Sequence, residues 1–192
     1  PSNFRCKGNL NDFLKEQDVP GIQGIDTRAL TKRLRDHGTM NGMISTVKYD
    51  DLTPIIEKIK AYQVGDVVSQ VTCKEKKNLP GKGKKVVLLD LGAKRHIAES
   101  LNERGCDVTI VPASTTADEI IAMNPDGIML SNGPGDPKTC TGIIKEIKKL
   151  YETDIPIFAI CLGHQLMALA NGIDTKKLKY GHRGGNHPVK DA

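Results

Sequence analysis

The chain has 192 residues, of which 38% are hydrophobic and 27% are charged, and its formal net charge is +5. This composition is typical of a globular chain with one ordinary domain or two small ones, and it excludes a largely disordered protein. No apolar run reaches the roughly 18 residues of a membrane span, and aromatic residues are only 4% with no tryptophan, so we expect no membrane and no nucleic acid among the partners.

The first 72 residues are predicted to form part of a smaller α/β domain. Amphipathic spacing predicts helices at 9–16, 26–37 and 53–62. Asp26 or Thr27 can cap the second of these helices, which should end near Gly38 because glycine favours helix C-termini. Residues 43–47, Met-Ile-Ser-Thr-Val, are suited to a short strand between the last two helices.

Residues 73–84 are rich in lysine and punctuated by glycine and proline, which predicts a solvated linker. From 85 to 192, apolar runs alternate with amphipathic segments. The runs predict strands at 86–91, 108–111, 127–130 and 155–160, and the segments between them predict helices at 94–104, 116–123 and 139–151. Such alternation indicates an α/β fold with a parallel sheet covered by helices on both faces. Ligands bind these sheets outside the carboxyl ends of the strands.

One strand end carries a cysteine. Phe158-Ala159-Ile160 leads into Cys161-Leu162-Gly163, where an apolar strand passes directly into a predicted helix. A sharp strand-to-helix turn of this kind exposes a nucleophile, and a glycine two residues later relieves crowding. The helix dipole stabilises a thiolate at that position, and the Leu162 amide is free to donate to an oxyanion. The alternative is that Cys161 is a small buried hydrophobe, as most unpaired cysteines are.

The other cysteines are interpreted as structural thiols. The five cysteines are odd in number, widely spaced and without a C-x-x-C pair, which argues against a zinc site or a disulfide framework. We therefore expect no metal site, reduced thiols and a cytoplasmic location. The four structural cysteines are Cys6, Cys73, Cys106 and Cys140.

A second strand end leads into Ser131-Asn132-Gly133-Pro134-Gly135-Asp136-Pro137. Two glycines and two prolines within five residues make a rigid turn with few side chains, so a ligand can approach the main-chain amides closely. The N–H group of Gly133 could then face an anion or a tetrahedral centre. Taken alone, the segment is an ordinary tight loop. Neither phosphate-loop pattern occurs here, so the loop does not indicate a nucleotide site.

Three histidines are candidate partners for the thiol. His164 lies about one helical turn after Cys161, but a residue in the body of a helix points along its side, so we do not expect His164 to be the general base. His182 and His187 belong to a glycine-rich basic loop, where contacts at the surface or at an interface are the simpler interpretation.

Two of these segments match known motifs. Residues 160–165, Ile-Cys-Leu-Gly-His-Gln, resemble the nucleophile motif of class I glutamine amidotransferases, and 131–137 resemble their oxyanion loop. Several families share this pair, including anthranilate synthases and GMP synthetases. Two further segments resemble the small (glutaminase) subunits of carbamoyl phosphate synthetases. They are 20–31, Pro-Gly-Ile-Gln-Gly-Ile-Asp-Thr-Arg-Ala-Leu-Thr, and 181–188, Gly-His-Arg-Gly-Gly-Asn-His-Pro.

The resemblance implies a fold and a reaction. Residues 85–192 would form a flavodoxin-like parallel sheet, incomplete at its C-terminal end. Cys161 would attack the side-chain amide of L-glutamine, the amides of Leu162 and Gly133 would hold the oxyanion, and Gly135 and Gln165 would help to seat the substrate. The ammonia would pass through a tunnel to a large subunit, which uses ATP, Mg and bicarbonate to make carbamoyl phosphate for arginine and pyrimidine synthesis. The resemblance implies no cofactor in this chain.

The sequence also departs from the family pattern. The family's general base is a His two residues before a Glu, downstream of the segment at 181–188, and its N-terminal domain is longer than 1–72 and supplies a Ser to the glutamine pocket. We therefore expect the chain to be an internal piece that hydrolyses glutamine negligibly by itself. Two other functions remain open: a non-catalytic module that docks to a synthetase, and the glutaminase component of another amidotransferase. A flavodoxin-like nucleotide binder is not favoured by the loops.

Overall fold

The computed structural model describes residues 4, 6–179 and 181. They divide into two compact units. The first, here called the helical unit, combines the residues up to Gln63 with those from Lys177 onwards, and the second, the sheet unit, comprises Val64–Lys176.

The helical unit contains the three predicted helices. They are α1 (Leu10–Glu16), α2 (Thr27–His37) and α3 (Thr53–Ala61). The side chain of Asp26 accepts a hydrogen bond from Ala29 N at 2.8 Å, and Gly38 closes α2 with a φ of +95°, a value that glycine adopts without strain. None of the three helices contains a buried residue.

The strand predicted at 43–47 is wrong. These residues form no strand, and Ile44 and Val47 are exposed. The side chain of Ser45 instead bonds within its own segment, accepting from Val47 N at 3.0 Å. A single strand without a partner leaves its N–H and C=O groups unpaired, and this local serine turn satisfies one of them.

The sheet unit is built on five strands in the order β1-β3-β2-β4-β5. They are β1 (Lys77–Leu79), β2 (Lys85–Asp90), β3 (Asp107–Pro112), β4 (Gly127–Leu130) and β5 (Ile157–Ala159). The pairs β2–β3, β2–β4 and β4–β5 are parallel, which confirms the predicted parallel sheet. Because the chain crosses from β3 back over β2 to β4, the order reverses beside β2, the position where sheets of this type open a crevice for ligands.

The segment predicted as a solvated linker contains β1, which pairs antiparallel with β3 and makes the sheet mixed. Its Leu79 packs against the cluster beneath the helix that follows β2. The side-chain amide of Asn102 holds the end of β1 by donating to Leu79 O at 3.1 Å and to Pro80 O at 2.9 Å. The strand was not predicted because the segment is rich in lysine. Leu79 is the one residue of β1 that packs against the smaller cluster.

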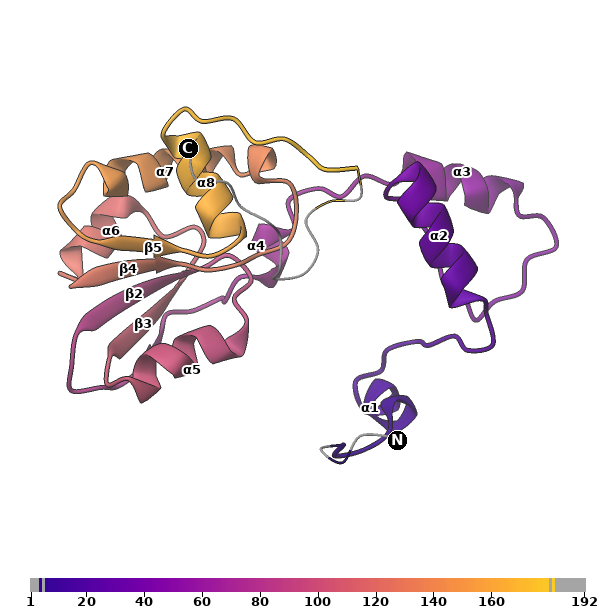
Figure 1. The fold of residues 1–192 in the computed structure, drawn as a ribbon, viewed down its shortest axis with the longest axis horizontal. Helices are drawn as coiled ribbons and strands as arrows, with labels where there is room; N and C mark the ends of the chain where they lie inside the picture. The colour runs from indigo at the N-terminus through magenta and orange to yellow at the C-terminus, as the bar shows by residue number, and fades with distance from the viewer. Residues whose placement is uncertain (1–3, 5, 180, 182–192) are drawn as a thin grey trace. The chain divides into compact units, whose positions relative to one another are not determined.

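Helices cover both faces of the sheet, as predicted. They are α4 (Val68–Val71), α5 (Arg95–Glu103), α6 (Ala117–Ala122), the short 3₁₀ helix η1 (Pro137–Thr139), α7 (Thr141–Tyr151) and α8 (Leu162–Ala170). Figure 1 shows α6, α7 and α8 on one side of the sheet and α5 on the other. Among the described residues, no helix has the length and apolar character that crossing a membrane requires.

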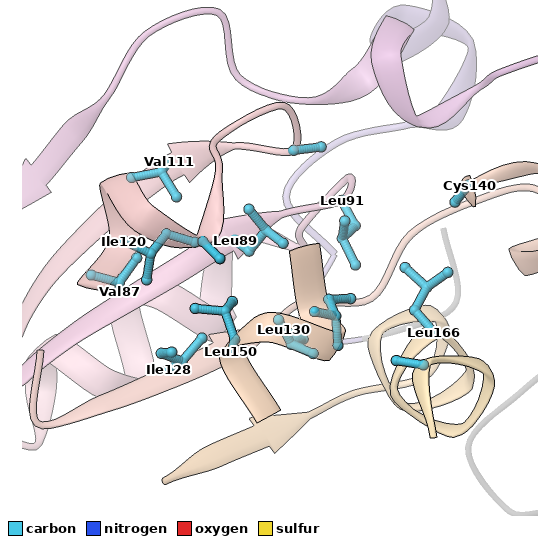
Figure 2. Packing of buried hydrophobic residues seen from close by; sticks show 14 of the residues in the cluster. Val87, Leu89, Leu91, Val111, Ile120, Ile128, Leu130, Cys140, Leu150 and Leu166 are labelled. Carbon is cyan, nitrogen blue, oxygen red and sulfur yellow. The ribbon is translucent and has the colours of Figure 1, made fainter. Parts of the chain in front are cut away.

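The alternation along each strand divides the core between the two faces. Val87 and Leu89 of β2 point into the larger cluster, together with residues of α6, α7 and α8, whereas Leu88 points into the smaller cluster with Ala98 of α5. Figure 2 shows the larger cluster, which includes Leu130 at the end of β4 and Leu150 of α7. The strand ends that carry the candidate site are thus held by fully buried apolar side chains.

Replacing Ile120 by alanine should lower the free energy of unfolding by about 2–5 kcal/mol, because its side chain is fully buried in the larger cluster. Its neighbour Ile121, 39% exposed on the same helix, is the matched control, and its replacement should cost about 1 kcal/mol or less. Urea unfolding of both variants measures the difference. Equal losses would show that α6 does not pack as described.

Candidate active site

The candidate site lies where β2, β4 and β5 end. Each strand leads into a short connection: 91–94 after β2, 131–136 after β4 and 160–161 after β5. Two backbone hydrogen bonds hold these segments together: Ile160 N of the third connection donates to Leu130 O at the end of β4 at 3.0 Å, and Gly163 N of α8 donates to Ser131 O of the second connection at 3.1 Å. The predicted loop and the predicted nucleophile turn therefore lie side by side.

Cys161 adopts a backbone conformation that few non-glycine residues take. Its φ is +51° and its ψ is −107°, and it immediately precedes α8. The residue is exposed, so it is not a small member of the core. The sharp strand-to-helix turn predicted from the sequence is confirmed, and strain of this kind gathers at functional sites.

Gly163 explains how α8 can begin so close to the sheet. A Cβ atom at this position would lie 2.6 Å from Leu130 O and 2.7 Å from Leu130 Cβ, distances that the backbone of β4 cannot accommodate. Leu162 and Leu166, both fully buried, hold the first turns of the helix in the core. The role predicted for a glycine two residues after the cysteine is confirmed.

Gly133 plays the same part for the loop after β4. A Cβ atom here would overlap Leu91 O and lie 2.7 Å from the Leu162 side chain. The loop therefore passes between the end of β2 and the start of α8. Gly135, two residues on, has a φ of +95° and is exposed.

Several backbone donors around the thiol are left unused, and two of them are the amides predicted to hold an oxyanion. Among the residues that the structure describes, neither Leu162 N nor Gly133 N donates a hydrogen bond to a protein acceptor. Leu162 is the first residue of α8, where N–H groups have no intrahelical partner and the helix dipole is positive. Two free amides next to an exposed thiol are the elements of an oxyanion site.

The connection after β2 has the opposite character, because its four N–H groups are all taken. Ser131 Oγ accepts from Leu91 N at 2.9 Å, Asp90 Oδ1 accepts from Gly92 N at 2.9 Å and from Ala93 N at 2.7 Å, and Asn132 Oδ1 accepts from Lys94 N at 3.0 Å. Three side chains thus fix the turn at 91–94, and none of its amides is left for a ligand.

These three side chains were not among the site residues predicted from the sequence. Asp90 and Ser131 are the only polar or charged residues of the described chain that are buried, at 8% and 0% exposure. An acid at the end of the apolar run Val86–Leu89 was the available signal, because buried carboxylates require hydrogen-bond donors. Which amides satisfy it depends on the loop path, which the sequence does not display.

The remaining predicted residues are placed as follows. Gln165 is half-buried one turn along α8, with its N–H bonded to Cys161 O at 3.1 Å. His164 is exposed on the same helix, and that it is not the general base stays a prediction. His182 and His187 lie outside the described residues.

The other thiols differ from Cys161 in their surroundings. All five cysteines are free. Burial raises the pKa of the Cys140 thiol, and burial together with the negative charge of Asp90 raises the pKa of the Cys73 thiol. A raised pKa leaves less of the reactive thiolate near neutral pH. In the described part of the chain, no group of three or more His, Cys, Asp or Glu side chains could hold a metal ion.

Two family models match the chain. The model described as Glutamine amidotransferase class-I matches residues 87–192, and that described as Carbamoyl-phosphate synthase small chain, CPSase domain, matches residues 1–44. The chain is 51% identical over 191 residues to the carbamoyl phosphate synthase small chain of Bacillus anthracis and 51% identical over 192 residues to that of Listeria innocua. In both alignments all of this chain is covered, and the chain spans about half, 52%, of the relative.

One solved structure adds a weaker similarity. The crystal structure of a putative GMP synthase protein from Thermoplasma acidophilum aligns with a TM-score of 0.42 and 28% identity, over 46% of this chain and 45% of that chain.

Replacing Gly163 by alanine should destabilise the sheet unit by about 1–3 kcal/mol, because the new methyl group would meet the backbone of β4. Gly142 is the matched control: it too is the second residue of a helix, but nothing lies within 4 Å of a Cβ placed there. Its replacement by alanine should cost no stability. Thermal unfolding of the two variants tests this, and equal midpoints would contradict the close approach.

Iodoacetamide should alkylate Cys161 at least about tenfold faster than Cys140 in the folded chain at neutral pH. Cys161 is exposed, whereas Cys140 is 7% exposed and its pKa is raised by burial, so less thiolate is present and reagent reaches it poorly. Peptide mass spectrometry over a time course gives both rates. In urea the two alkylation rates should become similar, because unfolding exposes both thiols. Similar rates in the folded chain would contradict the description of Cys161 as exposed and Cys140 as buried.

Proposed function

The chain belongs to the class I glutamine amidotransferases, and on that premise we propose that it provides the glutamine-hydrolysing site of a carbamoyl phosphate synthase small chain. The observation that carries the proposal is the strained, exposed Cys161, with the unused amides of Leu162 and Gly133 beside it. The match of residues 1–44 and the names of the relatives support this member of the class.

In the proposed reaction, the thiolate of Cys161 attacks the side-chain carbonyl carbon of L-glutamine. The carbonyl oxygen becomes an oxyanion, to which the amides of Leu162 and Gly133 donate. When the tetrahedral intermediate collapses, the C–N bond breaks, the amine takes up a proton and ammonia leaves a glutamyl thioester. Water then hydrolyses the thioester to glutamate and restores the thiol. We assign the proton transfers to the His that the family pattern places two residues before a Glu.

Gly135 and Gln165 are proposed to seat the glutamine. A φ of +95° at Gly135 turns the backbone of the loop in a way that a side chain would oppose, which leaves main-chain groups open to the substrate. Gln165 is half-buried one turn from Cys161 and carries both a donor and an acceptor. An amide side chain can pair with the polar groups of an amino acid.

The proposed partner is a large synthetase subunit that receives the ammonia and uses ATP, Mg and bicarbonate to form carbamoyl phosphate. The glutaminase step needs no cofactor, because the thiolate and the amides supply the nucleophile and the oxyanion donors. Five free thiols suit a reducing compartment, and we place the protein in the cytoplasm.

Two alternatives are less well supported. A purely docking module has no use for an exposed cysteine with a φ of +51°, since glycine would fill that position without strain. The glutaminase component of another amidotransferase would share residues 87–192, but it does not account for the match of residues 1–44.

In the full gene product that carries this chain, assayed with its synthetase partner, Cys161→Ala should abolish carbamoyl phosphate synthesis from glutamine by at least about 10³-fold. Synthesis from added ammonia should be retained, because ammonia bypasses the thiol. Enzymatic measurement of product from each nitrogen source separates the two. The matched control is Cys140→Ala, which removes a buried thiol and should leave both rates within about twofold.

Loss of both activities in Cys161→Ala would point to a structural role for the cysteine and against the proposal. Retention of the glutamine-dependent rate would remove Cys161 from the mechanism altogether. A gene product that releases ammonia from glutamine but makes no carbamoyl phosphate with the synthetase would favour another amidotransferase.

A further inference from the structure

The side chain of Asn132 joins two of the three connections at the candidate site. Its Oδ1 accepts from Lys94 N at 3.0 Å, and its Nδ2 donates to Gly92 O at 3.2 Å. Both ends of the amide are therefore bonded to the turn after β2. Lys94 is the N-cap residue of α5 and its own side chain makes no capping hydrogen bond, so Asn132 satisfies the Lys94 N–H at this helix end from a different segment.

The side-chain amide supplies both the acceptor and the donor that these two bonds need. Aspartate would keep the acceptor for Lys94 N but would place a second acceptor against Gly92 O, and alanine would make neither bond. The neighbouring Ser131 also links the loop after β4 to the turn after β2. Its buried hydroxyl accepts a hydrogen bond from Leu91 N and donates one to Asn132 O at 2.8 Å. The start of the loop is thus tied to the turn both by its backbone and by its side chain.

Gly133 follows Asn132 directly and has no means of its own to hold its position. It has no side chain, its N–H has no protein acceptor among the described residues, and it sits in close contact with Leu91 and Leu162. The direction of its N–H is set by the peptide that links it to Asn132. A shift of the Asn132 side chain would therefore change the direction of the Gly133 N–H, which lies in the loop beside the Cys161 turn.

We propose that Asn132 is a positioning residue for the oxyanion site. It fixes the Gly133 amide by clamping the loop after β4 to the turn after β2, and it does not itself touch the substrate. The inference rests on the proposed function, because an oxyanion forms only if Cys161 attacks a carbonyl. The inference also gives a role to the turn at 91–94. All four of its N–H groups are hydrogen-bonded, so the turn is a fixed support for the loop and not a ligand site.

The test compares Asn132→Asp with Asn102→Asp in the full gene product. Asn102 is likewise half-buried, and its Nδ2 donates to Leu79 O, Pro80 O and Cys106 O at the opposite, amino-terminal edge of the parallel strands. Both changes remove amide donors that hold backbone carbonyls, so both should lower the thermal unfolding midpoint. Only the first should disturb the oxyanion site.

Asn132→Asp should lower kcat for glutamine hydrolysis about 10- to 100-fold while KM stays within about twofold, because a displaced oxyanion donor is lost in the transition state and not in substrate binding. Asn102→Asp should leave kcat within about twofold. Alkylation of Cys161 by iodoacetamide displaces iodide and forms no oxyanion, so its rate should stay within about twofold in both variants.

Four results would overturn the inference. An unchanged kcat in Asn132→Asp would show that the clamp does not position the amide. Equal falls in kcat for both variants, or a matching fall in the alkylation rate, would reduce Asn132 to a structural role. If the unmodified protein shows no glutamine hydrolysis that depends on Cys161, the proposed function fails first, and the inference fails with it.

Discussion

At the end of β4, the carbonyl oxygen of Leu130 accepts a hydrogen bond from Ile160 N at 3.0 Å and lies where the start of α8 passes closest to the sheet. Because Gly163 has no side chain, the helix can begin against this backbone, and Gly163 N then bonds to Ser131 O. That contact forces the chain to turn sharply at Cys161. The thiol, the free amide of Leu162 and the neighbouring loop owe their proximity to it.

The parts of the structure that follow from periodicity could be predicted from the sequence. The parallel strands, the helices between them and the turn at Cys161 are local patterns of apolar spacing and glycine placement. Two segments were predicted incorrectly, for opposite reasons. Residues 43–47 have the composition of a strand but no partner strand, whereas Lys77–Leu79 have the composition of a linker but find β3 beside them. Strand pairing is decided by distant residues, and a local pattern does not contain it.

The same limit applies to the site. Cys161 and the two glycine-dependent connections were visible because each is a local departure from an apolar run. The supporting hydrogen bonds of Asp90, Ser131 and Asn132 reach 2 to 40 residues along the chain, and their partners are backbone groups that no sequence motif records. The geometry of the strand ends, and not residue type, determined which amides these side chains hold and which amides remain free.

The positive φ of Cys161 has a consequence for how this protein can evolve. Glycine would adopt the same backbone angles without strain, so selection for folding stability alone would favour glycine at position 161. A cysteine there is a compromise in which some stability is sacrificed for an accessible sulfur atom. Descendants that lost the need for the thiol would be free to relax this turn, and a glycine in place of the cysteine would be the trace of that loss.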